Sequence, residues 1–148
     1  MNRPNPITIL MADDDPDDRL LVKEAFKENS LINNLEMVED GEELMDLLHR
    51  RGKFTESNII PGLILLDLNM PKKSGLEALK EIKSDERLRR LPVVILTTSK
   101  AEEDIVRSYD LGVNSFIVKP VTFDSLVELV KELDRYWFKI VELPKLYN

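Results

Sequence analysis

The feature that most constrains the fold is an unbroken apolar run that ends on a carboxylate. Residues 63–66 read Leu-Ile-Leu-Leu, Asp67 follows directly, and a turn signal runs from Asn69 to Pro71. Four consecutive apolar residues before a turn indicate a strand that is buried on both faces, as in parallel sheets. Asp67 would then stand at the carboxyl end of that strand, where open α/β sheets place their functional groups. Taken alone, Asp67 is also compatible with an ordinary strand terminator or helix cap. The residues at the other strand ends distinguish these interpretations from a functional role.

Further short apolar segments alternate with helical patterns along the chain. Strands are predicted at residues 7–12, 35–39, 63–67, 93–96 and 115–118, and helices starting near Pro16, Glu42, Gly75, Glu102 and Phe123. In the first helix, the predicted helical stripe consists of Leu20, Leu21, Glu24, Ala25 and Phe26. This alternation predicts an α/β fold, namely a flavodoxin-like (βα)5 doubly wound parallel sheet with strand order 2-1-3-4-5, followed by a C-terminal extension.

Composition limits the class of protein. The 148 residues suffice for one domain with a real core, and the hydrophobic and charged fractions of 43% and 33% are ordinary for soluble proteins. The net charge of -7 argues against non-specific nucleic-acid binding, which needs a cationic face. The chain has no cysteine, no apolar run of membrane-spanning length and no signal-peptide core at its start. We therefore expect a cytoplasmic protein with no nucleic-acid or membrane partner.

The predicted strand order brings five polar side chains to one cleft. They follow strands 1, 3, 4 and 5, and they are Asp13, Asp14, Asp67, Thr97 and Lys119. Two carboxylates about 4 Å apart repel by on the order of 4 kcal/mol at an effective dielectric constant near 20. A divalent cation relieves this repulsion, and hard oxygen ligands without histidine or cysteine favour Mg²⁺. An aspartate can also accept a phosphoryl group, which a hydroxyl and an amine would help to position.

The order of these motifs resembles the receiver domain of two-component response regulators. The matching motifs are strand-Asp-Asp at Asp13 and Asp14, strand-Asp-x-x-x-Pro from Asp67 to Pro71, strand-Thr at Thr97 and strand-Lys-Pro at Lys119. Each motif is weak singly, but all of them in order on strand ends are specific. The resemblance covers residues 7–137 and implies a single receiver domain over 1–148, with an extension at 138–148.

The resemblance implies a role for each matching residue. Asp67 would be the phosphoacceptor, assisted by Thr97 and by Lys119, which would pair with the phosphoryl group. The Mg²⁺ ligands would be Asp13, Asp14, Asp67 and the backbone carbonyl of Asn69. The protein would take its phosphoryl group from a sensor histidine kinase and would catalyse only its own phosphorylation and dephosphorylation.

Thr97 and Phe116 would form the switch pair, in which the hydroxyl moves to the phosphoryl group and the aromatic ring turns inward. Phe116 lacks the hydroxyl of the tyrosine that is commoner in the family, so a hydrogen-bonded readout through that ring is lost. Thr98 stands where the family usually has a small residue, which would narrow access to the phosphoryl group. The peptide bond before Pro120 is usually cis in the family.

A narrower resemblance concerns the phytochrome-associated response regulators of bacteria. It rests on the Asp-rich start at residues 13–18, a longer loop at residues 52–61 and a tail that contains Trp137 and a Leu-Pro pair. It implies a bacterial phytochrome as the kinase partner.

Other functions remain open at this point. A haloacid-dehalogenase-like phosphatase also uses a strand-end aspartate with Mg²⁺, but it would need glycine at Pro16 and a further acidic pair. A receiver fold could also serve as a phosphorylation-independent binding module. Asp13, Asp15, Asp17 and Glu24 match part of a calcium-loop pattern, in which Asp18 stands where the pattern requires glycine.

The last helix carries more apolar side chains than one core-facing stripe needs. Its first stripe is Leu126, Val130, Leu133, Trp137 and Val141, and its second is Leu129, Tyr136, Ile140 and Leu143, with Phe138 in addition. A helix that is apolar on two sides must cover the second side. We expect a homodimer through this helix and the tail; the alternatives are a tail that folds back on its own domain and a kinase that covers the stripe.

Overall fold

The structure, a computed structural model, describes residues 8–138 and 142–144. Five parallel strands form one sheet in the order β2-β1-β3-β4-β5, as predicted. The strands are β1 (Thr8–Ala12), β2 (Leu35–Val38), β3 (Pro61–Leu66), β4 (Val93–Thr97) and β5 (Ser115–Val118). The helices are α1 (Pro16–Glu28), α2 (Gly41–His49), α3 (Gly75–Ser84), α4 (Glu102–Asp110) and α5 (Phe123–Leu133). Short 3₁₀ turns, η1 (Ile32–Asn34), η2 (Gly52–Phe54) and η3 (Leu88–Arg90), lie in the connections, and a π-helical turn, η4 (Asp134–Phe138), continues α5.

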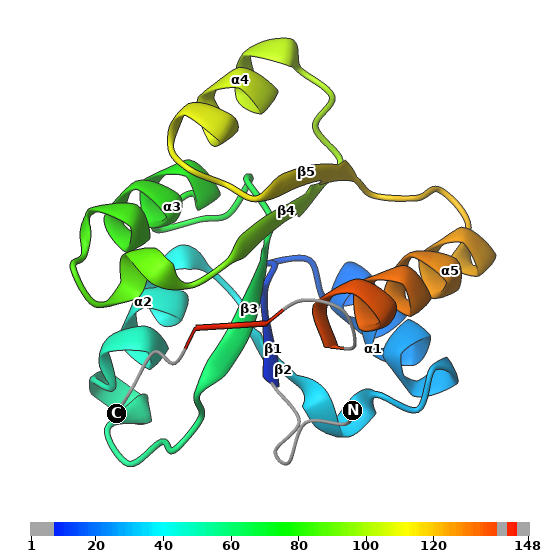
Figure 1. Cartoon of the computed structure of the whole chain (residues 1–148), viewed down its shortest axis with the longest axis horizontal. Helices are drawn as coiled ribbons and strands as arrows, with labels where there is room; N and C mark the ends of the chain where they lie inside the picture. Colours follow the sequence, from blue (N-terminus) through cyan, green and yellow to red (C-terminus); the bar gives the residue numbers. More distant parts are fainter. Residues whose placement is uncertain (1–7, 139–141, 145–148) are drawn as a thin grey trace.

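Side chains of the central strands alternate between two cores because successive residues of a strand point to opposite faces. Ile9, Met11, Leu63 and Leu65 pack with α1 and α5 on one face. Leu10, Ala12, Ile64 and Leu66 pack with α2 and α3 on the other. The central strands are therefore buried on both sides, as the run at residues 63–66 predicted, and Figure 1 shows the helices on the two faces of the sheet.

One part of the predicted helix packing is wrong. Leu20 and Leu21 are 56% and 46% exposed, and the buried side chains of α1 are Val22, Ala25 and Phe26. Val22, Ala25 and Phe26 are related by spacings of three and four residues and form the buried face of α1. Ala25 and Phe26 of the predicted stripe are therefore confirmed, whereas Leu20, Leu21 and Glu24 are exposed and Val22 is buried in addition.

The C-terminal part of the chain packs on the α1 and α5 side. Leu126, Val130, Leu133 and Trp137 are buried there, as predicted for the first stripe. Leu129 and Leu143 are partly buried against the same core, whereas Tyr136 is 50% exposed. Ile140, Val141 and the side chain of Phe138 lie outside what the structure describes. Residues 142–144 cross the middle of the view in Figure 1.

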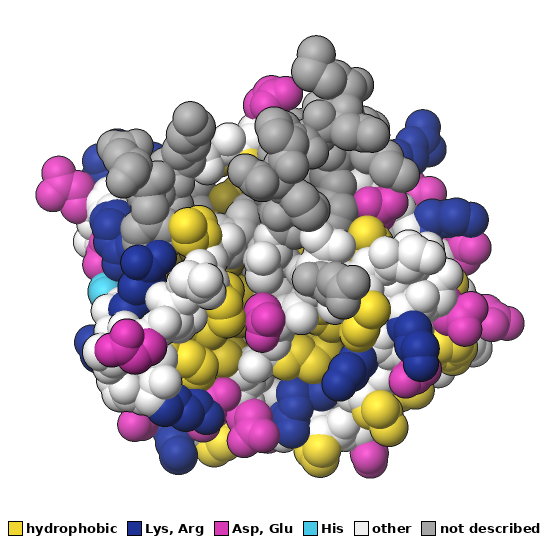
Figure 2. Space-filling view, turned by 90° about the horizontal axis from the view of Figure 1, so that it is seen from below, with side chains coloured by type: hydrophobic (Ala, Val, Ile, Leu, Met, Phe, Trp, Pro, Cys, Tyr) yellow, Lys and Arg dark blue, Asp and Glu magenta, His cyan; other side chains and the backbone are white. Residues whose placement is uncertain are grey.

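One face of the molecule combines charged side chains with a smaller apolar area. Seen from below Figure 1, hydrophobic side chains gather near the middle of the face, between basic and acidic side chains (Figure 2). Among the residues that the structure describes, no helix combines the length and apolar character needed to cross a lipid bilayer.

Candidate functional site: an acid cluster at the strand ends

Backbone hydrogen bonds hold the site residues just beyond the ends of the strands. The N–H of Asp13 donates to the carbonyl of Val38 at 3.2 Å, and the N–H of Asp67 donates to that of Ala12 at 3.0 Å. The N–H of Lys119 donates to the carbonyl of Thr97 at 2.8 Å. These bonds extend the pattern of the parallel sheet by one residue, so the sheet itself fixes where the functional side chains begin.

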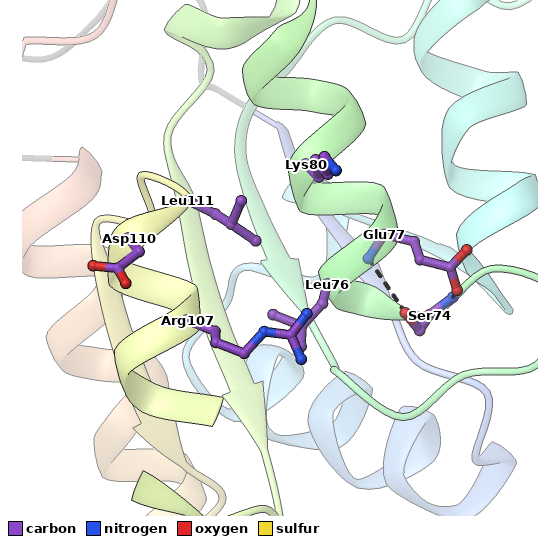
Figure 3. Close-up of a pocket in the computed structure, with 7 residues that line it drawn as sticks. All are labelled: Ser74, Leu76, Glu77, Lys80, Arg107, Asp110 and Leu111. Carbon is purple, nitrogen blue, oxygen red and sulfur yellow. Dashed lines mark hydrogen bonds between the residues drawn. The ribbon is translucent and has the colours of Figure 1, made fainter. Parts of the chain in front are cut away.

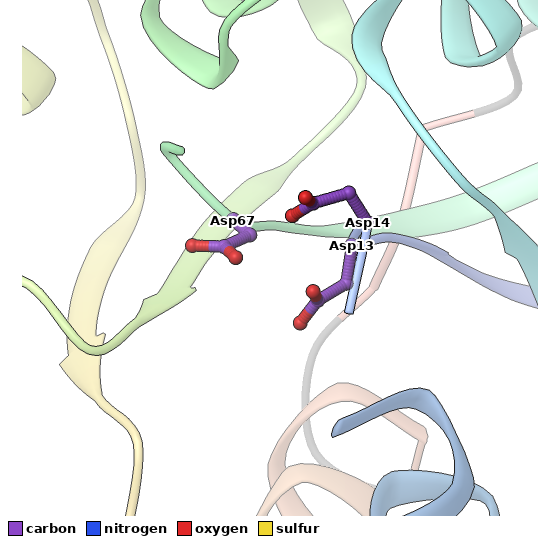
Figure 4. A group of neighbouring side chains, drawn as sticks. All are labelled: Asp13, Asp14 and Asp67. Atoms are coloured by element: carbon purple, nitrogen blue, oxygen red, sulfur yellow. The ribbon is translucent and has the colours of Figure 1, made fainter. Parts of the chain in front are cut away.

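Three carboxylates converge at this edge, as the strand order predicted. Oxygen atoms of Asp13, Asp14 and Asp67 all lie within 4.8 Å of one another, and Figure 4 shows the three side chains directed into one space. Asp13 and Asp67 are buried, whereas Asp14 is exposed. Three hard oxygen donors this close, one of them reached by solvent, fit a divalent cation that keeps several waters. We call Asp13, Asp14, Asp67, Thr97 and Lys119 the strand-end cluster.

Thr97 is bonded directly to the central carboxylate. Its Oγ1 donates to Oδ1 of Asp67 at 2.7 Å, and its side chain is fully buried. The backbone N–H of Ser99 also reaches Thr97 Oγ1, at 3.5 Å. The Thr97 hydroxyl is therefore hydrogen-bonded to the carboxylate that was predicted to accept the phosphoryl group.

Lys119 lies among the acids. Its Nζ is 2.6 Å from Oδ2 of Asp13, 2.7 Å from Oδ2 of Asp18 and 3.5 Å from Oδ2 of Asp67. Burial of the Lys119 ammonium opposes its charge, but hydrogen bonds to Asp13 and Asp18 and the charge of Asp67 outweigh that cost and raise its pKa. The lysine is thus a fixed positive charge beside Asp67.

Asp15 closes the start of α1 instead of joining the cluster. Its carboxylate accepts hydrogen bonds from the backbone N–H groups of Asp17 and Asp18, and Pro16 occupies the first turn. This is an ordinary N-cap with proline at the preferred position. The partial calcium-loop pattern at residues 13–24 is therefore a helix start.

Among the described residues, the side chains of two predicted site residues, Asn69 and Phe116, form no hydrogen bond with the cluster, and the peptide bond before Pro120 differs from the implied one. Asn69 is exposed in the connection after Asp67. Phe116 is partly buried against the core on the α2 and α3 side, and its backbone N–H donates to the hydroxyl of Tyr109 at 3.2 Å. The peptide bond before Pro120 is trans, in contrast to the implied cis bond; the two isomers of an X–Pro bond differ little in energy.

Asp18 and Gly75 contact the cluster and are among the residues that the sequence did not single out as site residues. Asp18 bonds Lys119 from the first turn of α1. At Gly75, a Cβ atom would lie 2.1 Å from the carbonyl oxygen of Asp67, so only glycine lets α3 begin this close to the acceptor. Gly75 was visible as a helix start, but its closeness to Asp67 depends on the path of the loop between them.

A hollow of about 480 Å³ lies away from these acids, between α3 and α4 (Figure 3). It is lined by Leu76, Leu111 and charged side chains, among them Lys80 and Arg107. None of the strand-end cluster lines it, so the acids and not this hollow define the candidate site.

Comparison with known proteins agrees with this geometry. Residues 9–131 match the family model described as the response regulator receiver domain. The response regulator Rcp1 of Synechocystis is 40% identical over 139 residues, which cover 94% of each chain. The chemotaxis protein CheY of Pseudomonas aeruginosa is 30% identical over 125 residues, which cover 84% of this chain and 94% of that protein.

Solved structures give the same answer. The phosphorylated cyanobacterial phytochrome response regulator RcpA superposes with a TM-score of 0.87 at 40% identity, covering 95% of this chain and 100% of the other. The Mn²⁺-bound form of Rcp1 superposes with a TM-score of 0.84 at 40% identity, covering 94% and 99%. The chain belongs to the receiver-domain family of response regulators.

Proposed function

We propose that this response regulator accepts a phosphoryl group on Asp67 from the phosphohistidine of a sensor kinase. The observation that carries the proposal is the convergence of Asp13, Asp14 and Asp67, with a buried hydroxyl and an ammonium at the same carboxylate. An oxygen of Asp67 forms the bond to phosphorus while the bond from phosphorus to the histidine nitrogen breaks. Thr97 and Lys119 donate to the transferred oxygens.

We propose Mg²⁺ as the cation, held by Asp13, Asp14, Asp67 and the backbone carbonyl of Asn69. The ion would neutralise the charge that gathers on the transferred oxygens. Support comes from the three convergent carboxylates and from the Mn²⁺ in the structure of Rcp1, an ion with similar oxygen ligands.

The proposed switch uses Thr97 and Phe116. The hydroxyl of Thr97 would leave the carboxylate for a phosphoryl oxygen, and the ring of Phe116 would move into the space beside it. Tyr109 supports a role for α4 in this change, because its hydroxyl accepts the backbone N–H of Phe116.

The proposed partner is a sensor histidine kinase of the phytochrome type, in keeping with the phytochrome response regulator RcpA. We propose a cytoplasmic receiver domain over residues 1–148, with its core at 7–137 and an extension at 138–148. The protein would act as no enzyme beyond its own phosphorylation and dephosphorylation, and would bind neither nucleic acid nor membrane.

The homodimer remains a prediction, and the apolar surface left for it on the last helix is smaller than the sequence predicted. Leu129 and Leu143 of the second stripe pack against the protein's own core, which favours a tail that folds back at these positions. Of that stripe, Tyr136 is the exposed member within the described residues. A homodimer through the last helix would therefore use Tyr136 together with side chains outside the first stripe.

Substitution of the acceptor tests the proposal. With Mg²⁺ and a small-molecule phosphodonor, the wild type should gain the mass of one phosphoryl group, and Asp67→Asn should gain none. Asp40→Asn is a matched control, because Asp40 is equally buried after β2 and asparagine caps helices as well as aspartate does. Intact mass spectrometry gives the readout.

Three other outcomes would contradict the proposal. Full phosphorylation of Asp67→Asn would refute the assignment of the acceptor. Release of inorganic phosphate from phosphate esters would indicate a phosphatase, and an unmodified wild type would indicate a binding module.

A further inference from the structure

A carboxylate from outside the strand-end cluster, that of Asp18, bonds the lysine of the cluster. Asp18 lies in the first turn of α1, and its Oδ2 is 2.7 Å from Lys119 Nζ, almost as close as Oδ2 of Asp13 at 2.6 Å. The side chain of Lys119 is 11% exposed and that of Asp18 is 31% exposed. Lys119 is therefore held from two places, by Asp13 directly after β1 and by Asp18 in α1, which are 106 and 101 residues away in the sequence.

Asp18 is not one of the three acids that converge at the strand ends. The carboxylates whose oxygens meet within 4.8 Å are Asp13, Asp14 and Asp67. The contact of Asp18 is with the ammonium, so its effect on Asp67 must pass through Lys119.

Two bonds fix an ammonium better than one. Lysine has a flexible four-carbon stem and three N–H donors in a tetrahedral arrangement. One bond to Asp13 leaves the ammonium free to turn about that contact. A second bond to Asp18 removes this freedom and leaves the third N–H for the side of Asp67, 3.5 Å away.

The position of Asp18 is itself well determined. The backbone N–H of Asp15 donates to Oδ1 of Asp13 at 3.0 Å, and that of Asp18 donates to Oδ1 of Asp15 at 3.3 Å. The helix that follows is anchored in the core by Val22, Ala25 and Phe26. These links tie the first turn of α1 to the end of β1, where the cluster begins.

We propose that Asp18 is a positioning residue for Lys119, which holds the ammonium ready for the phosphoryl oxygens at Asp67. The inference rests on the proposed role of Asp67. It assigns α1 a part in phosphoryl transfer in addition to its packing against the sheet.

A pair of matched variants tests the inference. Asp17→Asn and Asp18→Asn each remove one negative charge from the first turn of α1, but of these two aspartates it is Asp18 that bonds Lys119. With Mg²⁺ and a small-molecule phosphodonor, Asp18→Asn should be phosphorylated roughly 3- to 10-fold more slowly than Asp17→Asn, because the donor group is no longer fixed. Equal rates, or a faster Asp18→Asn, would overturn the proposal. A wild type that gains no phosphoryl group would instead refute the proposed function.

A second comparison shows whether the effect passes through Lys119. In a Lys119→Met background the two asparagine variants should react at the same rate, since there is no ammonium to position. A difference that persists there would assign Asp18 another role and end the inference.

A spectroscopic measurement keeps the test independent of activity. An ammonium group that forms two hydrogen bonds and is shielded from solvent exchanges its protons slowly. The ¹⁵N–¹H signal of the Lys119 ammonium should therefore be visible in the wild type and in Asp17→Asn. It should broaden or disappear in Asp18→Asn while the rest of the spectrum stays native. An unchanged Lys119 signal in Asp18→Asn would contradict the proposed contact.

Discussion

Two groups of acids stand near the carboxyl ends of strands in this protein, and they differ in what surrounds them. The strand-end cluster gathers Asp13, Asp14 and Asp67 around a lysine that is nearly enclosed. A second group, here called the helix-start cluster, surrounds the first turn of α2 after β2 and consists of Asp40, Glu42, Glu43, Asp46, Lys53 and Lys72.

In the helix-start cluster, Asp40 caps the helix and the two lysines form ion pairs at the surface. Asp40 caps α2 by accepting the backbone N–H of Glu43 at 2.8 Å. Glu43 pairs with Lys53 at 3.0 Å, and Lys72 lies 3.7 Å from Asp40. Both lysines are more than 60% exposed, at 69% and 63%, so solvent screens these pairs.

The comparison teaches that composition does not identify a functional acid. A carboxylate that caps a helix has its hydrogen bonds satisfied and stabilises the fold. Carboxylates that converge from separate strands repel one another and lower stability until a cation or a phosphoryl reaction uses them. Three predictions sharpen this contrast.

The largest expected difference is in metal affinity. Asp14→Ala removes one of the convergent carboxylates. Loss of an outer-shell partner typically lowers metal affinity by roughly 10- to 100-fold, so loss of a direct ligand should weaken Mg²⁺ binding by at least this factor. Glu42→Ala, an exposed acid of the helix-start cluster, should leave the affinity within about twofold, since remote surface charges are largely screened. Isothermal titration calorimetry compares the two, and an unchanged affinity in Asp14→Ala would exclude Asp14 as a ligand.

Stability without metal should change in opposite directions in the two clusters. Asp40→Ala loses an N-cap and should lower the free energy of unfolding by about 1 kcal/mol. Asp14→Ala removes one like charge from the strand-end cluster and should leave that free energy unchanged or higher. Urea denaturation in the presence of a chelator measures both; a clear loss of stability in Asp14→Ala would mean that its carboxylate has a structural partner.

The smallest expected difference concerns alkaline pH. The pKa of Lys119 is raised because its bonds to Asp13 and Asp18 outweigh burial, and that of Lys53 is raised by its bond to Glu43. A lysine whose pKa is higher in the folded state stabilises the fold below its unfolded value of 10.5 and loses this contribution as the pH rises through the folded value.

The free energy of unfolding of the metal-free wild type should therefore fall above pH 10.5, and fall less steeply in Lys119→Met. Any flattening in Lys53→Met should disappear at high salt, because Lys53 is exposed, whereas that in Lys119→Met should persist. Identical slopes in wild type and Lys119→Met would show that the Lys119 contacts add nothing to stability.

The sequence by itself determined the architecture and the members of the strand-end cluster. The apolar run before Asp67 and the alternation of strands and helices are local patterns, and the sheet order follows from short right-handed connections. Because parallel strands end at one edge, residues directly after four strands had to meet. Asp13, Asp67, Thr97 and Lys119 were therefore found without any knowledge of distances.

Tertiary structure decided which side chains touch. The turn of α1 about its axis exposes Leu20 and Leu21 and places Asp18 on Lys119, 101 residues away in the chain. The path of the loop after β3 brings Gly75 against Asp67, and the packing after α5 brings Leu143 onto the protein's own core. Periodicity describes one element at a time, whereas these contacts depend on how separate elements rotate and approach, which only the packed molecule determines.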